Sequence, residues 1–267
     1  MSLTENIYSA INDKMHFLAA IIDVKKAFDC VNHNILISKL ERFGVRGLPL
    51  NWLISYLTDR KCYVQLGPHK SSLNTFNIGV PQGSILGPTL FLVYVNNLPK
   101  FSNILTTQLF ADDTIVSNTG TSVNSLIDST NNELSNLKDW TIANKLTIHA
   151  GKTKLLVVSN RIQSSQNISI SILDSVISPS DSCKYLGVYL DSKLTFKDHI
   201  KYIMSKISRH TGILHKIRDN LPIKSILDYY YAYIYPYLSY NTAIWGGTYP
   251  IHMVPLIRQQ KRTKNYG

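Results

Sequence analysis

Two short apolar runs in this chain end in carboxylates. Residues 17–22 are continuously apolar and lead into Asp23, and residues 109–111 lead into the adjacent Asp112 and Asp113. A short, continuous apolar run is typical of a buried strand. Acidic groups at the ends of buried strands are costly unless something positive neutralises them. The pattern therefore predicts a divalent metal site that brings these three acids together.

The composition bounds the kind of protein this can be. With 267 residues and 44% hydrophobic content, the chain can build one large or two smaller cores. The longest candidate for a membrane span, residues 85–95, is interrupted by Gly87 and Pro88 and falls short of the ~20 apolar residues required. The N-terminus has no signal-peptide pattern, and three widely spaced cysteines favour reduced thiols. We expect an intracellular globular protein that does not enter the membrane.

The positive charge is concentrated toward the C-terminus. From Lys193 onward there are twelve lysines or arginines against three acids, which accounts for nine of the net +11. Such asymmetry favours a polyanionic partner, although a solvated basic surface would give the same count.

Hydrophobic periodicity predicts an α+β protein, with an antiparallel sheet covered on one face by helices. Strands are expected at 17–23, 61–66, 73–80, 154–158, 168–173 and 184–190, and helices at 33–43, 49–58, 84–95 and 122–143. A hairpin is expected around Asp112 and Asp113, and a polar linker at 159–167. A small basic helical domain is predicted from about residue 193.

Seven tyrosines lie between Tyr229 and Tyr240. Stacking on nucleic-acid bases is one interpretation. Helix packing is the other, and we favour it because the segment lies within a predicted helical region.

Three carboxylates from two distant strands can hold two divalent ions, which suit an in-line displacement at phosphorus. By itself, this chemistry fits both nucleotidyl transfer and phosphodiester hydrolysis. The sequence around the acids contains five blocks. The first block is residues 20–33, with Asp23, Phe28 and Asp29, and the second is residues 79–88, with Pro-Gln82-Gly83, which continues to 95–99. The third is residues 110–113, Phe-Ala-Asp-Asp, and the fourth is residues 144–154, with Lys152. The fifth is residues 184–200, with Lys184-Tyr-Leu-Gly-Val188.

These blocks, in this order, resemble the reverse transcriptases of non-LTR retrotransposons, the LINE elements and especially their jockey-like group. The resemblance implies a polymerase palm with its primer-grip hairpin over residues 1–192. A mostly helical, basic thumb and the start of a C-terminal connection would follow over 193–267. It also implies that the fingers are largely absent and that the chain is truncated at both ends.

The resemblance assigns a role to each matching residue. Asp23 and Asp112 would be the principal metal ligands, with Asp113 as a supporting acid and the backbone carbonyl of Val24 completing the coordination. Lys152 would lie near the leaving pyrophosphate. The remaining assignments are nucleotide contacts at Phe28, Gln82 and Gly83, a primer grip at Tyr185, Leu186 and Gly187, and nucleic-acid contacts at Lys197 and Lys201.

Phe28 matches the steric gate that crowds a ribose 2′-hydroxyl, and a core aromatic is the alternative interpretation. Asp29, in the same block, is expected to have a structural role. The chain departs from the family pattern at Asn97, where relatives usually carry aspartate, and at residues 149–151, His-Ala-Gly, where Asn-Pro is more common.

The implied function is an RNA-directed DNA polymerase that transfers nucleotides from dNTPs to a DNA primer 3′-hydroxyl on an RNA template. Two Mg²⁺ ions, or Mn²⁺ as a substitute, would be its cofactors, and it would act in the nucleus. The alternative from another class is a catalytically silent remnant that still binds nucleic acid. A group II intron maturase is a more distant possibility.

Overall fold

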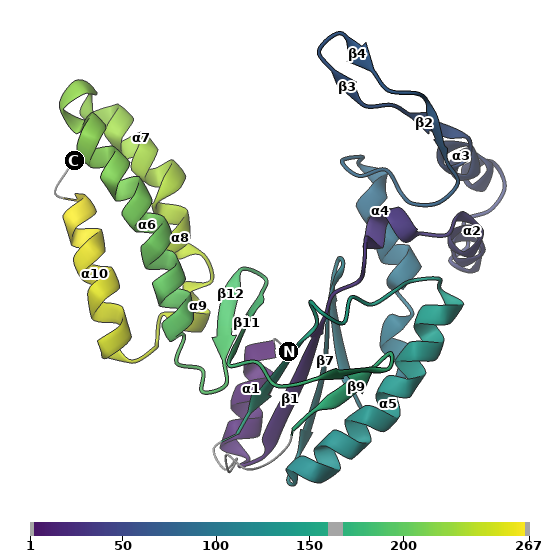
Figure 1. The fold of residues 1–267 in the computed structure, drawn as a ribbon, viewed down its shortest axis with the longest axis horizontal. Coiled ribbons are helices and arrows are strands. Elements are labelled where there is room, and N and C mark those ends of the chain that lie inside the picture. The colour runs from purple at the N-terminus through teal and green to yellow at the C-terminus, as the bar shows by residue number, and fades with distance from the viewer. Residues whose placement is uncertain (1–2, 160–167, 265–267) are drawn as a thin grey trace. The chain divides into compact units, whose positions relative to one another are not determined.

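The computed structural model describes residues 3–159 and 168–264, so nearly all of the predicted linker at 159–167 lies outside the described residues. The chain divides into two compact units. Residues 15–155 and 163–179 are called the sheet unit, and residues 1–14, 156–162 and 180–267 the helical unit. Figure 1 shows the elements of both units. Among the described residues, no helix has the length and apolar character that a membrane span requires.

The central sheet has the strand order β6-β7-β1-β8. These strands are β1 (His16–Ile22), β6 (Thr106–Phe110), β7 (Asp113–Gly120) and β8 (Lys154–Val158). Both β1 and β6 pair antiparallel with β7. Six of the seven β1 residues are buried, as a continuous apolar run requires. The predicted α+β class with an antiparallel sheet is therefore confirmed.

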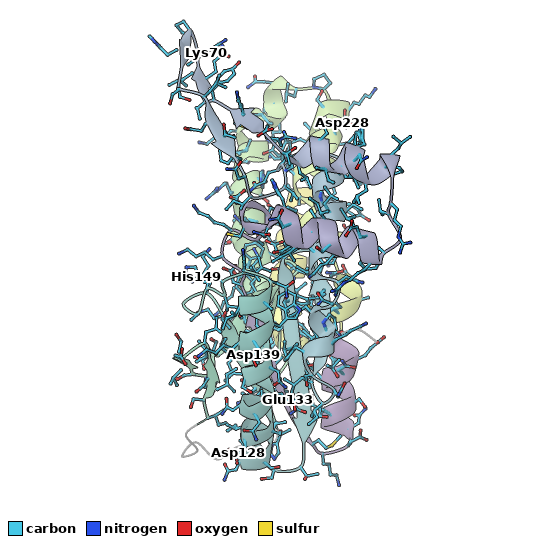
Figure 2. The ribbon with its side chains drawn as sticks, turned by 90° about the vertical axis from the view of Figure 1, so that its right-hand side faces the viewer. Lys70, Asp128, Glu133, Asp139, His149 and Asp228 are labelled. Carbon is cyan, nitrogen blue, oxygen red and sulfur yellow. The ribbon has the colours of Figure 1, made fainter. Side chains whose placement is uncertain are left out.

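Helix α5 (Val123–Ala143) covers the sheet by packing against β1 and β7. Val123, Leu134 and Leu137 are buried, as the helical spacing predicts, whereas Ile127 of the same predicted stripe is only partly buried and Leu126 is buried beside it. Figure 2 shows Asp128, Glu133 and Asp139 distributed along the same helix. Further elements of the sheet unit are α2 (His33–Arg42), α3 (Leu48–Leu57), α4 (Leu86–Val95), β9 (Ile170–Ile172), β10 (Ser175–Ile177) and the 3₁₀ turns Ala27–Cys30 and Leu98–Phe101.

The strands predicted at 61–66 and 73–80 form a hairpin of two short pairs instead of one long pair. Strand β2 (Arg60–Cys62) pairs with β5 (Asn74–Phe76), and β3 (Gln65–Leu66) pairs with β4 (His69–Lys70). Figure 2 shows Lys70 near the tip of this hairpin. Because nearly all of its side chains are exposed, no buried face enforces a longer register.

A lysine of α2 joins three segments of the sheet unit. The Lys39 ammonium donates to the Tyr94 carbonyl, to Asn97 Oδ1 at 2.8 Å and to Asn144 Oδ1 at 2.5 Å. The Tyr94 hydroxyl in turn donates to the Asn144 carbonyl at 2.5 Å. Burial, and to a smaller extent the charge of Arg42, lowers the pKa of Lys39 to about 8. Each of its three side-chain hydrogen bonds thus ends on a neutral oxygen.

Supplying a carboxylate to Lys39 should stabilise the fold. The folded pKa near 8 lies below the ordinary value of 10.5, so the partly buried ammonium is disfavoured below pH 8, and this disadvantage disappears as pH rises toward 10.5. Asn97 is exposed, so we expect Asn97→Asp to raise the free energy of unfolding by only about 1 kcal/mol at pH 7. The gain should shrink at pH 9.5. Urea unfolding at pH 7 and at pH 9.5 measures the two gains, with Asn96→Asp as the matched control. An equal gain in the control would contradict an ion pair between Lys39 and the carboxylate introduced by Asn97→Asp.

The helical unit combines a short hairpin with a group of helices. Its elements are α1 (Leu3–Asn12), β11 (Ser182–Tyr185), β12 (Val188–Asp191), α6 (Lys197–Ile217), the 3₁₀ turn Arg218–Asn220, α7 (Ile223–Tyr233), α8 (Tyr235–Ser239), α9 (Thr242–Trp245) and α10 (Pro250–Lys264). Asp191 accepts hydrogen bonds from the amides of Thr195 and Phe196 at 3.0 and 2.7 Å, which fixes the approach to α6. Gln259 of α10 donates to Ser208 of α6 at 2.5 Å.

The tyrosine-rich segment contributes both to packing and to the surface. Tyr229, Tyr233 and Tyr237 surround the His210 ring of α6, and His210 Nδ1 lies 2.9 Å from the Tyr229 hydroxyl. Tyr231 is 59% exposed. The favoured packing interpretation therefore applies to the cluster around His210, whereas some tyrosines remain accessible to solvent.

Candidate active site

The three predicted acids meet at one edge of the sheet because of the register of β1 and β7. Ile22, the last residue of β1, pairs with Thr114, so Asp23 and Asp113 follow at the same end of the ladder. Asp112 occupies the tight turn between β6 and β7, where Ala111 adopts a left-handed conformation with φ 53°. Burial, followed by the charges of Asp112 and Asp23, raises the pKa of Asp113. The three carboxylates are therefore close enough for their charges to interact.

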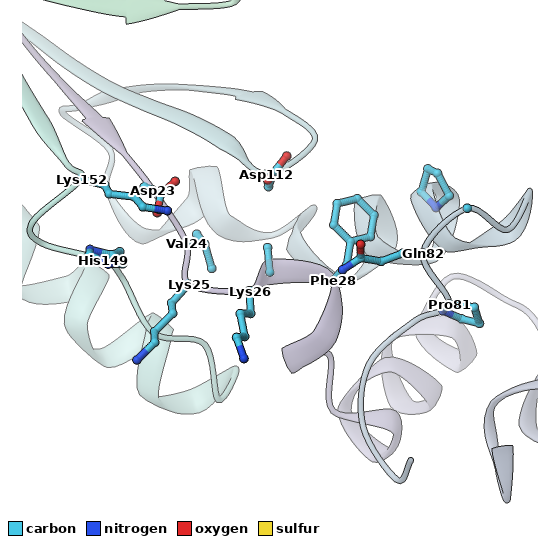
Figure 3. A pocket seen from close by; sticks show the side chains of 13 residues that line it. Asp23, Val24, Lys25, Lys26, Phe28, Pro81, Gln82, Asp112, His149 and Lys152 are labelled. Atoms are coloured by element: carbon cyan, nitrogen blue, oxygen red, sulfur yellow. The ribbon is translucent and has the colours of Figure 1, made fainter. Parts of the chain in front are cut away.

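A cavity of about 700 Å³ opens beside these acids. Figure 3 shows the side chains that line it. It contains all the predicted catalytic and nucleotide-binding residues except Asp113: Asp23, Val24, Phe28, Gln82, Gly83, Asp112 and Lys152. Residues from four of the five sequence blocks thus line a single cavity.

Lys152 makes an ion pair with Asp23, at 3.8 Å between Nζ and Oδ2. Both side chains are partly exposed, so the pair contributes little to stability. Its significance is positional, because it places a partly exposed cation at the edge of the acidic site. A bound ion or a polyphosphate would compete for one of the two partners.

The segment that carries Lys152 is joined to the end of β1 by backbone pairing. The Lys25 amide donates to the Thr147 carbonyl at 2.8 Å, and the His149 amide donates to the Asp23 carbonyl at 2.7 Å. Val24 and Ile148 form the bridge between these bonds, which do not use the Val24 carbonyl. That carbonyl is therefore compatible with its predicted role as a ligand.

Phe28 lies on the opposite side of the cavity from the acids, where its ring stacks on Phe91 of α4. The ring centroids are 4.6 Å apart and the rings are inclined by 24°. Phe28 is half-buried, so one part of the ring supports the core while another faces the cavity. Both interpretations of this residue, gate and core aromatic, have a structural basis.

The Pro-Gln-Gly loop completes the cavity through Gln82 and Gly83. Gly83 has φ 79°, a left-handed conformation that side chains disfavour. Gln82 Nε2 donates to Asp29 Oδ1 at 2.8 Å. Asp29, expected to have a structural role, therefore contacts a predicted nucleotide-binding residue.

Three further polar residues line the cavity without a predicted role: Lys25, Lys26 and His149. Lys25 and Lys26 are exposed and place two cations two and three residues after Asp23. A signal was present, since all three lie within the first and fourth blocks. Their convergence depends on the pairing of residues 23–25 with 147–149, which local spacing does not reveal.

The donor set suits a hard divalent cation. The described residues contain no group of three Asp, Glu, His or Cys side chains already gathered around a metal position. Mg²⁺ does not require such a cage, since one or two carboxylates, waters and substrate phosphates complete its octahedral shell. Asp23 and Asp112 on one cavity wall, with Asp113 adjacent to Asp112, meet that requirement.

The predicted primer grip and basic residues lie in the helical unit. Leu186 and Gly187 form the turn between β11 and β12, with φ 42° and 82°. The Tyr240 hydroxyl donates to the Leu186 carbonyl at 2.8 Å, and a Cβ at Gly187 would lie 3.0 Å from the Tyr240 ring. Lys197 and Lys201 begin α6, where Lys201 lies 3.6 Å from Asp198.

Comparison with known proteins gives a consistent result. The family model described as reverse transcriptase (RNA-dependent DNA polymerase) matches residues 2–190. The RNA-directed DNA polymerase from mobile element jockey of Drosophila melanogaster is 28% identical over 95% of this chain and 28% of its own length. The probable RNA-directed DNA polymerase from transposon BS of the same species is 28% identical, over 91% and 28%.

This chain therefore spans about 28% of the length of these two relatives. Among solved structures, apo telomerase from Candida tropicalis aligns with a TM-score of 0.48 and 12% identity, over 98% of this chain and 49% of that one.

Proposed function

Because the chain belongs to the reverse transcriptase family, we propose that it is an RNA-directed DNA polymerase of a non-LTR retrotransposon. Its reaction would add a deoxynucleotide from a dNTP to the 3′-hydroxyl of a DNA primer paired with an RNA template, releasing pyrophosphate. The observation that carries this proposal is the convergence of Asp23, Asp112, Phe28, Gln82 and Lys152 on one cavity.

Divalent metal ions are generally used by this family, and the acids at the sheet edge are the groups that would hold them. Asp23, Asp112 and the Val24 carbonyl would be ligands, with Asp113 in support. Two such ions, Mg²⁺ or Mn²⁺, stabilise the charge on the attacking and leaving oxygens of a phosphoryl displacement. Burial, followed by repulsion from Asp112 and Asp23, raises the pKa of Asp113, and a bound cation would offset both effects.

The remaining residues of the cavity would bind and orient the nucleotide. Lys25, Lys26 and Lys152 supply positive charge on the cavity wall, which suits a triphosphate and a leaving pyrophosphate. Phe28 would limit space beside the sugar, and Gln82 and Gly83 would contact the nucleotide from the opposite loop.

Outside this cavity, we propose residues 1–192 as the palm and residues 193–267 as the thumb. The braced turn at Tyr185, Leu186 and Gly187 suits a role in supporting a primer end. Lys197 and Lys201 would contact backbone phosphates, which fix register without reading sequence. We place the activity in the nucleus, where priming on chromosomal DNA would occur.

Primer extension tests the proposal. Purified chain is incubated with an RNA template, an annealed DNA primer, dNTPs and either Mg²⁺ or Mn²⁺, beside the Asp112→Asn, Asp113→Asn double variant. We expect the wild type, and not the double variant, to extend the primer. Retention of the duplex in a gel-shift assay without extension would contradict the proposal and identify a nucleic-acid-binding remnant.

A further inference from the structure

A second cavity, of about 500 Å³, adjoins the loop that carries Gln82. Gln82 and Pro81 line both cavities, whereas Asp29 lines the second and is not one of the residues that line the first. The carboxylate of Asp29 therefore reaches Gln82 from outside the catalytic cavity. This arrangement allows Asp29 to act on the catalytic cavity through Gln82.

The backbones of the two residues are fixed relative to each other. The Val80 amide donates to the Phe28 carbonyl at 2.8 Å, and the Gly79 amide donates to the Val31 carbonyl at 2.7 Å. His33 Nε2 lies 2.8 Å from the Gly79 carbonyl oxygen. These contacts hold residues 28–33 against residues 79–80.

Gly79 permits this close approach because it has no side chain. Its φ is 89°, and a Cβ there would lie 2.9 Å from the carbonyl oxygen of Asp29. The loop thus meets the Asp29 backbone directly, and the 2.8 Å bond from Gln82 to Asp29 closes the same junction through side chains. Three hydrogen bonds therefore join residues 28–33 to residues 79–80, and a fourth joins the side chains of Asp29 and Gln82.

The chemistry of the two side chains sets the orientation of the Gln82 amide. A carboxylate only accepts hydrogen bonds, so it must face the Gln82 NH₂ group and not its oxygen. The carbonyl oxygen of the same planar amide then points away from Asp29. The hydrogen bond to Asp29 thereby leaves the carbonyl oxygen of Gln82 as the hydrogen-bond acceptor that faces the catalytic cavity.

We propose that Asp29 is a positioning residue of the nucleotide site, which locks Gln82 with its carbonyl oxygen available to a hydrogen-bond donor of the incoming nucleotide. Asp29 itself does not touch the nucleotide. The inference rests on the proposed function, because it assigns Gln82 to nucleotide binding. It predicts a loss of nucleotide affinity, with the chemical step and duplex binding nearly unchanged.

Steady-state primer extension tests this inference with Asp29→Ala, Asp29→Asn and Cys62→Ser. Cys62 is an exposed residue of the second cavity and serves as the matched control. We expect Asp29→Ala to raise the dNTP KM about fivefold, because it removes one solvent-exposed charged hydrogen bond. Its kcat should stay within about twofold of the wild-type value. Asp29→Asn, which keeps an acceptor, should recover part of the affinity, and Cys62→Ser should match the wild type.

A double-mutant cycle separates positioning from general damage to the fold. If Asp29 acts through Gln82, Asp29→Ala should add no further increase in KM when Gln82 is already alanine. An equal increase in both backgrounds, or a parallel fall in kcat and duplex affinity, would overturn the inference.

A binding measurement supplies a readout without turnover. It determines the equilibrium affinity of dNTP for the complex of the protein with Mg²⁺ and a template annealed to a dideoxy-terminated primer. A wild type that neither binds dNTP nor extends primers would contradict the proposed function. Binding that is equal in the wild type and Asp29→Ala would overturn only the inference.

Discussion

Asp112→Asn is expected to slow primer extension by at least about a thousandfold, equivalent to about 4 kcal/mol of transition-state stabilisation. Asparagine matches aspartate in size but removes the negative charge from the turn between β6 and β7. The remaining acids would hold a divalent ion less tightly, and the charge on the attacking and leaving oxygens would lose its compensation. Single-turnover extension at saturating dNTP measures the effect.

The fold should not suffer from this change. Burial is the main cause of the raised pKa of Asp113, and the charge of Asp112 adds to it, so removing that charge relieves part of the repulsion at the sheet edge. We therefore expect the thermal midpoint in metal-free buffer to stay equal or to rise, and duplex affinity by gel shift to remain unchanged. Asp59→Asn, in an exposed left-handed position that asparagine tolerates, controls for the loss of one negative charge. A variant that kept a tenth of the wild-type rate would contradict the assignment of Asp112.

The elements that the sequence predicted best are those with strong local signals. β1 has a continuous apolar run, and α5 has an apolar stripe at helical spacing, so both were predicted within about a residue or two. The strand predicted at 184–190 is instead the hairpin β11–β12, as the family resemblance implied. Leu186 and Gly187 reverse the chain there in left-handed conformations, and for Leu186 no local pattern announces this.

The N-terminal helix α1 was not predicted, because the segment is short and its apolar residues Leu3, Ile7 and Ala10 are buried only in the folded unit. Helix propensity alone is weak over ten residues. Tertiary burial decides the structure of such segments.

At the site, the sequence identified the acids because each follows an apolar run, and the blocks assigned Phe28, Gln82 and Lys152 by resemblance. The sequence did not identify what holds them in place. The Asp23 carbonyl accepts from the His149 amide, and Gln82 donates to Asp29, across long stretches of chain. Such partners are determined by packing, and a single sequence carries no periodic signal for them.

Phe28→Val is expected to raise the use of ribonucleotides relative to deoxynucleotides about a hundredfold, measured as the ratio of kcat/KM for the two triphosphates. The cavity face of the ring would occupy the space that a 2′-hydroxyl needs, and valine would open it. Phe28→Tyr keeps the ring and should retain deoxynucleotide selectivity.

Because Phe28 also stacks on Phe91, the test must separate a steric gate from a core aromatic residue. Phe28→Val loses the 4.6 Å stacked pair and part of a half-buried side chain, so urea unfolding should show a loss of about 2 kcal/mol under either interpretation. A purely structural residue would lower kcat/KM for both triphosphates by the same factor, leaving their ratio unchanged. If Phe28 is a gate, Phe28→Val would lower kcat/KM for the deoxynucleotide only and would raise kcat/KM for the ribonucleotide. Because the ratio is taken within one variant, the loss of stability cancels from it, and only the space beside the sugar remains to explain a change.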